Sequence, residues 1–173
     1  MHSGQAHQSP NQSLYTADER RRRDASRWTI VQGVLAPVQF VIFLISVWFV
    51  VRFLVTGVGE SSATSSVVIK TLVLYTIMIT GAIWEKEVFG QYLFARPFFW
   101  EDVFSMLVLA LHTAYLVALA TGTLSVTALM LLALAAYAAY LINAIQFILK
   151  LRAARREAPA AALRSPHFAE AAQ

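Results

Sequence analysis

The sequence predicts an all-α, polytopic membrane protein: a bundle of four transmembrane helices with both termini on the cytoplasmic side. Hydrophobic residues make up 58% of its 173 residues, whereas soluble domains have roughly 45–50%. They are concentrated in four long apolar segments, and one membrane span needs about 20 such residues. Lys and Arg gather at the chain ends and in the middle connection, which places these parts in the cytoplasm.

The N-terminal segment, residues 1–27, is polar and basic. Its outermost dozen residues are expected to be disordered. Thr16 and Glu19 have the spacing of a capping box, so a short helix is expected to begin directly after Thr16. The run from Arg20 to Arg23 then precedes the first apolar segment. That segment starts too late and is too long for a cleaved signal peptide.

The expected spans cover approximately residues 29–55, 67–84, 102–121 and 126–149. The first and third connections contain no Lys or Arg, whereas the middle one contains Lys86 and Arg96. An even number of spans with this bias puts both chain ends and the middle connection on the cytoplasmic side. The C-terminal tail, residues 151–173, is basic at first; after Arg156 it is Ala-rich with two prolines and is expected to be disordered.

Several classes of function are excluded or disfavoured by composition. The chain has no cysteine, which excludes disulfides, thiolate metal sites and cysteine nucleophiles. Its net charge of +4 does not indicate a nucleic-acid partner, because the basic residues flank apolar segments. We find no Gly-rich phosphate loop and no nucleophile elbow. No spacing of His, Asp and Glu predicts a metal site formed by the protein alone.

The middle connection holds the candidate catalytic residues. It is bounded by two near-copies, WEKEVF from Trp84 and WEDVF from Trp100, and contains seven aromatic residues. One copy ends a span and the other begins the next, so Glu85 and Glu101 are expected at similar depth. Together with Asp102 they predict an aromatic mouth with paired carboxylates, suited to a large planar ligand and to proton transfer. The alternative is structural: aromatic residues favour the membrane interface, and acids favour a helix N-terminus.

Polar residues inside the spans crowd toward the cytoplasmic half and predict a pocket that opens there. His112 can be an axial ligand to a chelated metal, an acid–base group, or a packed histidine bonded to a hydroxyl such as that of Tyr75. The amides can equally serve helix–helix hydrogen bonding. The predicted binding residues are His112, Tyr75, Gln39, Asn143, Gln146, Trp84, Trp100 and Arg96.

Three segments carry a resemblance to a known family: LYTADERRRRDASRWTIVQGVLAPVQF (14–40), KTLVLYTIMITGAIWEKEVFGQYLFARPFFWEDVFSMLVLALHTAYL (70–116) and AAYAAYLINAIQFILKLRAAR (135–155). They resemble the 3-vinyl bacteriochlorophyllide hydratase family. The resemblance implies a hydro-lyase that adds water across the 3-vinyl group of chlorophyllide a or a bacteriochlorophyllide, giving a 3-(1-hydroxyethyl) group. It also implies a bacterial cytoplasmic or intracytoplasmic photosynthetic membrane, with lipid and other enzymes of bacteriochlorophyll biosynthesis as neighbours. No added cofactor is expected, because the substrate carries its own magnesium.

That activity suggests a mechanism. A hydroxyl on the inner vinyl carbon implies that the terminal CH2 is protonated first. We expect Glu85 or Glu101 to be the general acid, with the partner carboxylate orienting the water. Arg96, Lys86 or Arg27 is expected to pair with the propionate of the pigment, and His112 to bind its magnesium.

Two other classes remain open from the residues alone. A pigment-binding or assembly subunit of a photosynthetic complex needs the aromatic mouth and His112, but no paired acids. A proton-coupled carrier usually has internal repeats and polar groups at the bilayer midplane, whereas here the polar groups crowd one side.

Overall fold

The computed structural model describes residues 14–163, and within this range the chain is entirely helical apart from its connections. This confirms the all-α class. The elements are α1 (Ala17–Ala25), α2 (Arg27–Thr56), α3 (Glu60–Phe89), the short 3₁₀ helix η1 (Arg96–Phe98), α4 (Phe99–Thr121) and α5 (Val126–Leu163).

Four helices are long and apolar enough to cross a membrane, as predicted: α2, α3, α4 with η1, and α5 as far as Lys150. The helices continue beyond the apolar segments. α3 begins at Glu60 instead of residue 67, and α5 extends to Leu163, past the point where disorder was expected. The stretch from 151 to 163 contains six Ala, three Arg and two Leu, which are strong helix formers. The expected disorder of the first dozen residues and of 164–173 lies outside the described residues.

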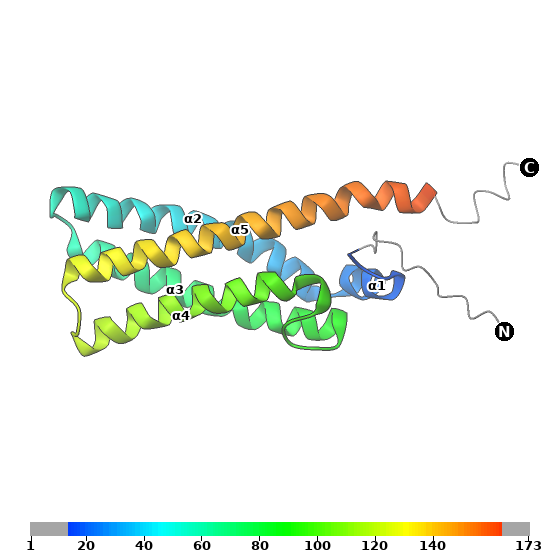
Figure 1. Ribbon diagram of the computed structural model, residues 1–173, viewed down its shortest axis with the longest axis horizontal. Coiled ribbons are helices and arrows are strands. Elements are labelled where there is room, and N and C mark those ends of the chain that lie inside the picture. The colour runs from blue at the N-terminus through cyan, green and yellow to red at the C-terminus, as the bar shows by residue number, and fades with distance from the viewer. Residues whose placement is uncertain (1–13, 164–173) are drawn as a thin grey trace, which may run out of the picture.

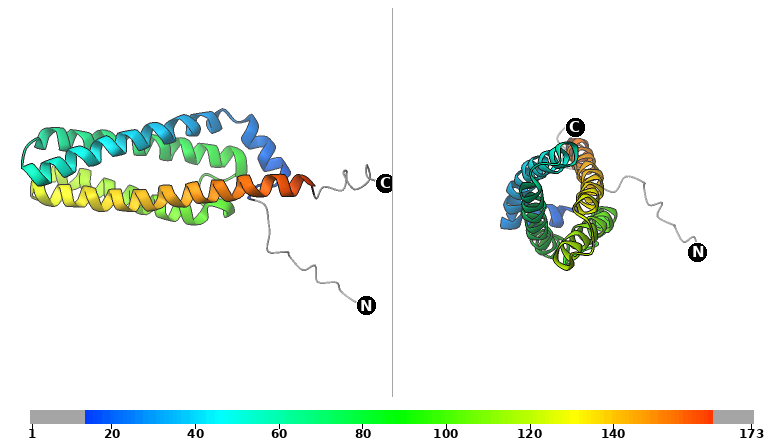
Figure 2. Two further views of the ribbon diagram at one scale, coloured as in Figure 1. Left: turned by 90° about the horizontal axis from the view of Figure 1, so that it is seen from above. Right: turned by 90° about the vertical axis from the view of Figure 1, so that its left-hand side faces the viewer.

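The four long helices form two antiparallel hairpins, because α2 packs chiefly on α3 and α4 chiefly on α5. Figure 1 shows the α2–α3 and α4–α5 turns at one end of the bundle, with α1 and the α3–α4 connection at the other. Figure 2 shows the four helices arranged around a common axis when the bundle is seen from its end. In both figures α2 and α5 diverge toward the α1 end. We call the two ends the turn end and the α1 end.

The core is tightest toward the turn end, where small residues allow the helices to approach closely. Ala63 on α3 and Ala133 on α5 are almost completely buried. The Ser46 hydroxyl of α2 hydrogen-bonds both the Tyr137 hydroxyl of α5 and the Ser66 hydroxyl of α3. These bonds join the two hairpins and satisfy polar groups that have no water available in a membrane.

The short helix α1 begins as predicted. The Thr16 side chain accepts from the Glu19 N–H at 3.3 Å, and the Glu19 carboxylate accepts from the Thr16 N–H at 2.7 Å. This reciprocal capping box fixes the start of α1. α1 then packs against the end of α3, so it covers one end of the bundle.

We expect Ala63→Leu to destabilise the protein, because the added methyl groups have no space between α3 and its neighbours at a position with 0% exposure. Overpacking of this kind costs about 1–3 kcal/mol. A thermal melt in detergent should show a lower Tm than for Ala110→Leu, a matched substitution at an exposed position of α4. Equal melting temperatures would contradict the tight packing at the turn end.

Candidate functional site

A cavity of about 890 Å³ lies between the two hairpins at the α1 end and is lined by residues of α1, α2, α3, α4 and α5. Its volume is near the upper end of the roughly 300–1,000 Å³ found for small-molecule pockets, so it suits a large ligand. Most of the lining is apolar. The charged lining residues are Arg20, Arg23, Glu85 and Asp102.

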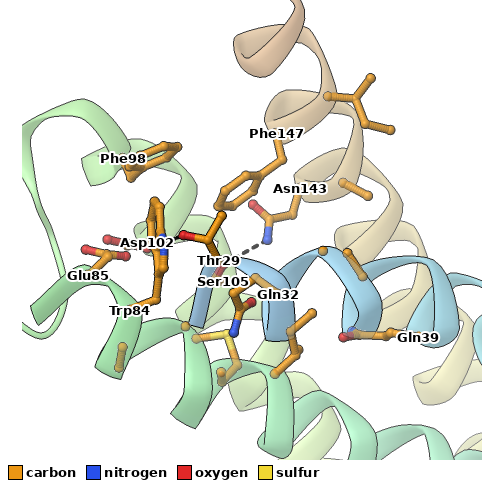
Figure 3. Close-up of a pocket in the computed structure, with 18 of the residues that line it drawn as sticks. Thr29, Gln32, Gln39, Trp84, Glu85, Phe98, Asp102, Ser105, Asn143 and Phe147 are labelled. Carbon is orange, nitrogen blue, oxygen red and sulfur yellow. Dashed lines mark hydrogen bonds between the residues drawn. The ribbon is translucent and has the colours of Figure 1, made fainter. Parts of the chain in front are cut away.

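Two buried carboxyl groups meet at the wall of this pocket. Glu85 lies in the last turns of α3 and Asp102 in the first turn of α4, with exposures of 5% and 4%. Their carboxyl groups lie close to each other (Figure 3). Two neighbouring carboxylates repel each other, which favours a proton on one of them. The pair can therefore donate one proton and accept another.

The α3–α4 connection holds the two carboxyl groups in place with backbone N–H groups. Phe94 N–H donates to Asp102 Oδ2 at 2.7 Å, and Ala95 N–H donates to Glu85 Oε2 at 3.3 Å. Phe94 has φ of 61°, a left-handed conformation that costs a non-glycine residue about 1–3 kcal/mol. Backbone strain of this size is retained where it positions functional groups, and here it directs two successive N–H groups at the carboxyl pair.

Glu101 does not join this pair, although it was expected to face Glu85. Its carboxylate accepts a hydrogen bond from Lys150 Nζ of α5 at 2.6 Å, and it does not line the pocket. The reason is helical geometry: consecutive residues point about 100° apart. When Asp102 faces α3, Glu101 is turned toward α5. The near-copied motifs therefore bring together Glu85 and Asp102, not the two glutamates.

The predicted binding residues divide into two groups. Gln39, Asn143 and Trp84 line the pocket, and the Asn143 Nδ2 donates to Ser105 Oγ of α4 at 2.8 Å. The other predicted residues lie outside the lining. Gln146 is partly buried, Tyr75 hydrogen-bonds Thr113 at 2.7 Å, and Arg96 and Trp100 are exposed.

His112 is completely buried in the bundle core and does not reach the pocket. Its Nδ1 is 2.8 Å from the Val108 carbonyl oxygen, and its Nε2 is 2.8 Å from Lys70 Nζ. Lys70 is equally buried and lies 4.2 Å from the Tyr140 ring centroid, a cation–π contact. Both imidazole nitrogens are thus engaged inside the protein. This placement does not offer His112 as a ligand to a bound pigment.

The pocket is covered by α1, a part of the site that the sequence did not predict. Tyr15 stacks on Phe89 at 5.8 Å and packs on Phe98 at 6.3 Å, and the Arg23 guanidinium lies over the Tyr15 ring at 4.7 Å. Burial raises the pKa of the Tyr15 phenol, so its hydroxyl keeps its proton at neutral pH. The capping box indicated a helix here, but no periodic pattern in so short a helix indicates where it docks.

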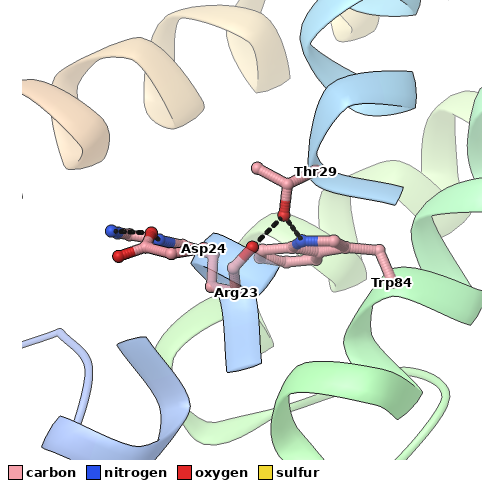
Figure 4. A network of polar contacts seen from close by, with 4 residues as sticks. All are labelled: Arg23, Asp24, Thr29 and Trp84. Atoms are coloured by element: carbon pink, nitrogen blue, oxygen red, sulfur yellow. Dashed lines mark hydrogen bonds and ion pairs between the residues drawn. The ribbon is translucent and has the colours of Figure 1, made fainter. Parts of the chain in front are cut away.

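One threonine links α1 to the bundle. Thr29 Oγ1 donates to the Arg23 carbonyl at 2.6 Å and accepts from Trp84 Nε1 of α3 at 2.9 Å, as Figure 4 shows. The Arg23 side chain also bonds Asp24 through Nε and Nη2, at 2.9 and 2.7 Å. The end of α1, the start of α2 and the aromatic wall of the pocket are thus joined through a single hydroxyl.

Side chains that could hold a metal ion do not cluster within residues 14–163: no group of three or more His, Asp or Glu residues comes together there. The acidic residues that line the pocket are Glu85 and Asp102.

Comparison with known proteins gives concordant results. The 2-vinyl bacteriochlorophyllide hydratase family matches residues 15–153. The chain is 62% identical over 152 residues to a 2-vinyl bacteriochlorophyllide hydratase of Cereibacter sphaeroides, covering 88% of this chain and 94% of that protein. It is 64% identical over 146 residues to the protein of the same name from Rhodobacter capsulatus, covering 84% and 85%. No solved structure matches the chain.

We expect Thr29→Val to loosen α1 while leaving the bundle intact, because it removes both hydroxyl bonds and leaves the Trp84 N–H unpaired. An unsatisfied buried donor costs about 1–3 kcal/mol. Hydrogen–deuterium exchange should become several-fold faster in residues 17–25 and remain unchanged in α4. Thr127→Val, at an exposed position of α5, is the control. Unchanged exchange in α1 would show that Thr29 does not hold it.

Proposed function

This chain belongs to the 2-vinyl bacteriochlorophyllide hydratase family, and on that premise we propose that it hydrates the pigment in the α1-end pocket, with Glu85 and Asp102 as its acid–base pair. It is an enzyme that adds water to the vinyl group in bacteriochlorophyll biosynthesis. The observation that carries the assignment of the site is the position of two buried carboxyl groups close together in the wall of a large pocket.

The chemistry of the reaction matches this pair. Hydration that puts the hydroxyl on the inner vinyl carbon begins with protonation of the terminal CH2. The resulting cation is stabilised by the conjugated macrocycle. A carboxyl group that holds a proton away from bulk water is suited to deliver it, and the neighbouring carboxylate can accept the proton that the water later releases.

The shape and lining of the pocket suit a flat, largely apolar pigment. Trp84, Phe98 and Phe147 supply aromatic surface next to the carboxyl pair, and aromatic rings stack favourably on one another. Phe40 of α2 and Ile148 of α5 line the pocket and are also exposed, by 41% and 51%. We place the entrance there, between the diverging helices, so that the macrocycle arrives from the lipid. The substrate brings its magnesium, and the proposal requires no added cofactor.

The carboxylate of the pigment needs a cation, and α1 supplies one. Arg20 lines the pocket and, among residues 14–163, has no carboxylate partner. Lys86 donates to the Gly90 carbonyl at 2.8 Å. It lies outside the pocket lining, as do Arg27 and Arg96. We therefore assign the propionate to Arg20, with Arg23 beside it, in place of the three cations expected from sequence.

Orientation in the membrane follows from the charges at the α1 end. Lys86, Arg96, Lys150 and the arginines of α1 all lie there, and cytoplasmic flanks carry such an excess. We propose that this end, with both termini and the pocket, faces the cytoplasm. In a photosynthetic bacterium the same orientation would hold in the intracytoplasmic membrane.

We expect Glu85→Gln and Asp102→Asn each to lower hydration about 10²–10⁴-fold, the usual contribution of a positioned acid or base. Pigment binding should persist, because the amides keep the size of the side chains. Membranes that contain each variant are incubated with chlorophyllide a, and products are analysed by chromatography and mass for the gain of one water. Glu60→Gln, at an exposed position of the turn end, is the control.

The same assay separates the alternatives. Full activity in both variants would contradict the assignment of the acid pair. If only Glu101→Gln loses activity, the general acid is Glu101, on the side of α4 that faces Lys150. Pigment binding by the unaltered protein with no gain of mass would favour a pigment-binding subunit instead.

For the propionate, we expect Arg20→Gln to raise the KM for chlorophyllide a about tenfold with little change in kcat. A charge-assisted hydrogen bond to a carboxylate is typically worth about 1.5–3 kcal/mol, and uniform binding is expressed in KM. The methyl ester of the pigment should show no such difference between the two proteins. Arg22→Gln, at an exposed position of α1, serves as control. An equal rise in KM in this variant would show that Arg20 acts only through the general positive charge of α1.

A further inference from the structure

Two amide side chains in the pocket have carbonyl oxygens without a donor. Gln39 Oε1 and Asn143 Oδ1 are buried, and neither accepts a hydrogen bond from any residue in 14–163. Both residues line the pocket, and the Gln39 side chain is only 2% exposed. Because buried acceptors in proteins almost always have a partner, these two oxygens indicate a site for a small hydrogen-bond donor.

The surrounding contacts fix how the two amides face the cavity. The Asn143 amino group donates to Ser105 Oγ, so the carbonyl end of the same amide turns away from that bond. Ser105 lies one turn after Asp102 on α4, so the bond from Asn143 reaches α4 one turn away from the carboxyl pair (Figure 3). Gln39 precedes Phe43 by one turn on α2, and Phe43 packs on Tyr140 of α5 at 4.9 Å. Since Asn143 follows Tyr140 by one turn, the two amides approach the pocket from facing helices.

We propose that Gln39 and Asn143 hold the water molecule that reacts with the vinyl group, an inference that rests on the proposed function. A water that donates both of its O–H groups to two carbonyl oxygens keeps its lone pairs free, and the oxygen is then aimed at the electron-poor carbon. Neutral amides also suit this position for a second reason. A carboxylate in contact with the cation could capture it as an ester, whereas an amide oxygen is a far weaker nucleophile.

The steps balance without another reactant. The carboxyl proton of the Glu85–Asp102 pair moves to the terminal CH2 of the vinyl group, whose π bond breaks to leave a cation on the inner carbon. The oxygen of the held water forms a C–O bond to that carbon. One proton of this water then passes to the carboxylate, which restores the pair and leaves the 1-hydroxyethyl group. Until water attacks, the cation can also return a proton to the carboxylate and regenerate the vinyl group.

That return step provides the test. In D2O, each reversal can leave deuterium on the terminal vinyl carbon, so recovered substrate reports protonation and product reports capture by water. We expect Gln39→Leu and Asn143→Leu to lower hydration about tenfold or more, because a positioned hydrogen-bonding group is lost. The amount of deuterium in recovered chlorophyllide a, divided by the amount of product formed, should rise by a similar factor. Mass spectrometry measures both quantities in one sample.

Gln32→Leu is the matched control, because Gln32 also lines the pocket but, within residues 14–163, its carbonyl oxygen is not a buried acceptor without a donor. Its ratio of exchange to hydration should equal that of the unaltered protein. Gln39→Met, with a side chain of similar length, repeats the measurement if the leucine variant does not bind pigment.

Three results would overturn the proposal. Exchange and hydration that fall in parallel would place Gln39 and Asn143 in protonation or in folding. Unaltered hydration in the variants would remove any role for them, and an equal rise in Gln32→Leu would remove their specificity. Absence of hydration by the unaltered protein is a different result, because it refutes the proposed function itself.

Discussion

The α1 end of the molecule depends on the burial of two carboxyl groups at the junction of α3 and α4. Removing such groups from water is costly unless hydrogen bonds replace the lost solvent, and here the backbone of the connection supplies them. The Phe94 and Ala95 N–H groups bind the pair, which fixes the path of the chain into η1. That path buries Phe98 against Tyr15 and Phe147. The same two groups therefore shape the pocket wall and provide its only buried acid pair among the described residues.

Other charged side chains of the molecule are held outside the carboxyl pair. Glu101 is paired with Lys150 on the other side of α4. Lys70 is kept within the core by His112 and the ring of Tyr140. Arg20 and Arg23 reach the pocket only from α1. The cations that could bind a substrate carboxylate thus approach from the covering helix, whereas the proton-carrying groups lie in the wall between the hairpins.

Sequence patterns were sufficient for the architecture because bilayer thickness and the internal satisfaction of backbone groups leave few alternatives for long apolar segments. They also predicted a pocket at one end of the bundle, since polar residues inside spans crowd there, and the structure has a cavity at that end. They did not resolve which acid pairs with Glu85, because Glu101 and Asp102 are adjacent and only the rotation of α4 decides between them. Arg20 was not predicted as a pocket residue for a different reason. Basic residues near a membrane are expected equally when they only set the orientation of the protein, so they do not indicate a binding role. In addition, the docking of α1 depends on contacts between residues distant in sequence, such as Thr29 with Trp84.

The position of the site at the rim of a membrane bundle is consistent with the difficulty of the reaction. Water is abundant at either surface of a membrane, so its supply outside the protein does not limit hydration of a vinyl group. The difficult step is protonation of carbon, which needs an acid that has not already lost its proton to bulk water. In the proposed site the macrocycle would enter from the lipid, and the buried Glu85 and Asp102 would provide such an acid. Exclusion of bulk water, however, also removes the nucleophile, so a site of this kind must hold its own water. Two buried amide oxygens in the same cavity meet that requirement without adding a second base that would take the proton first.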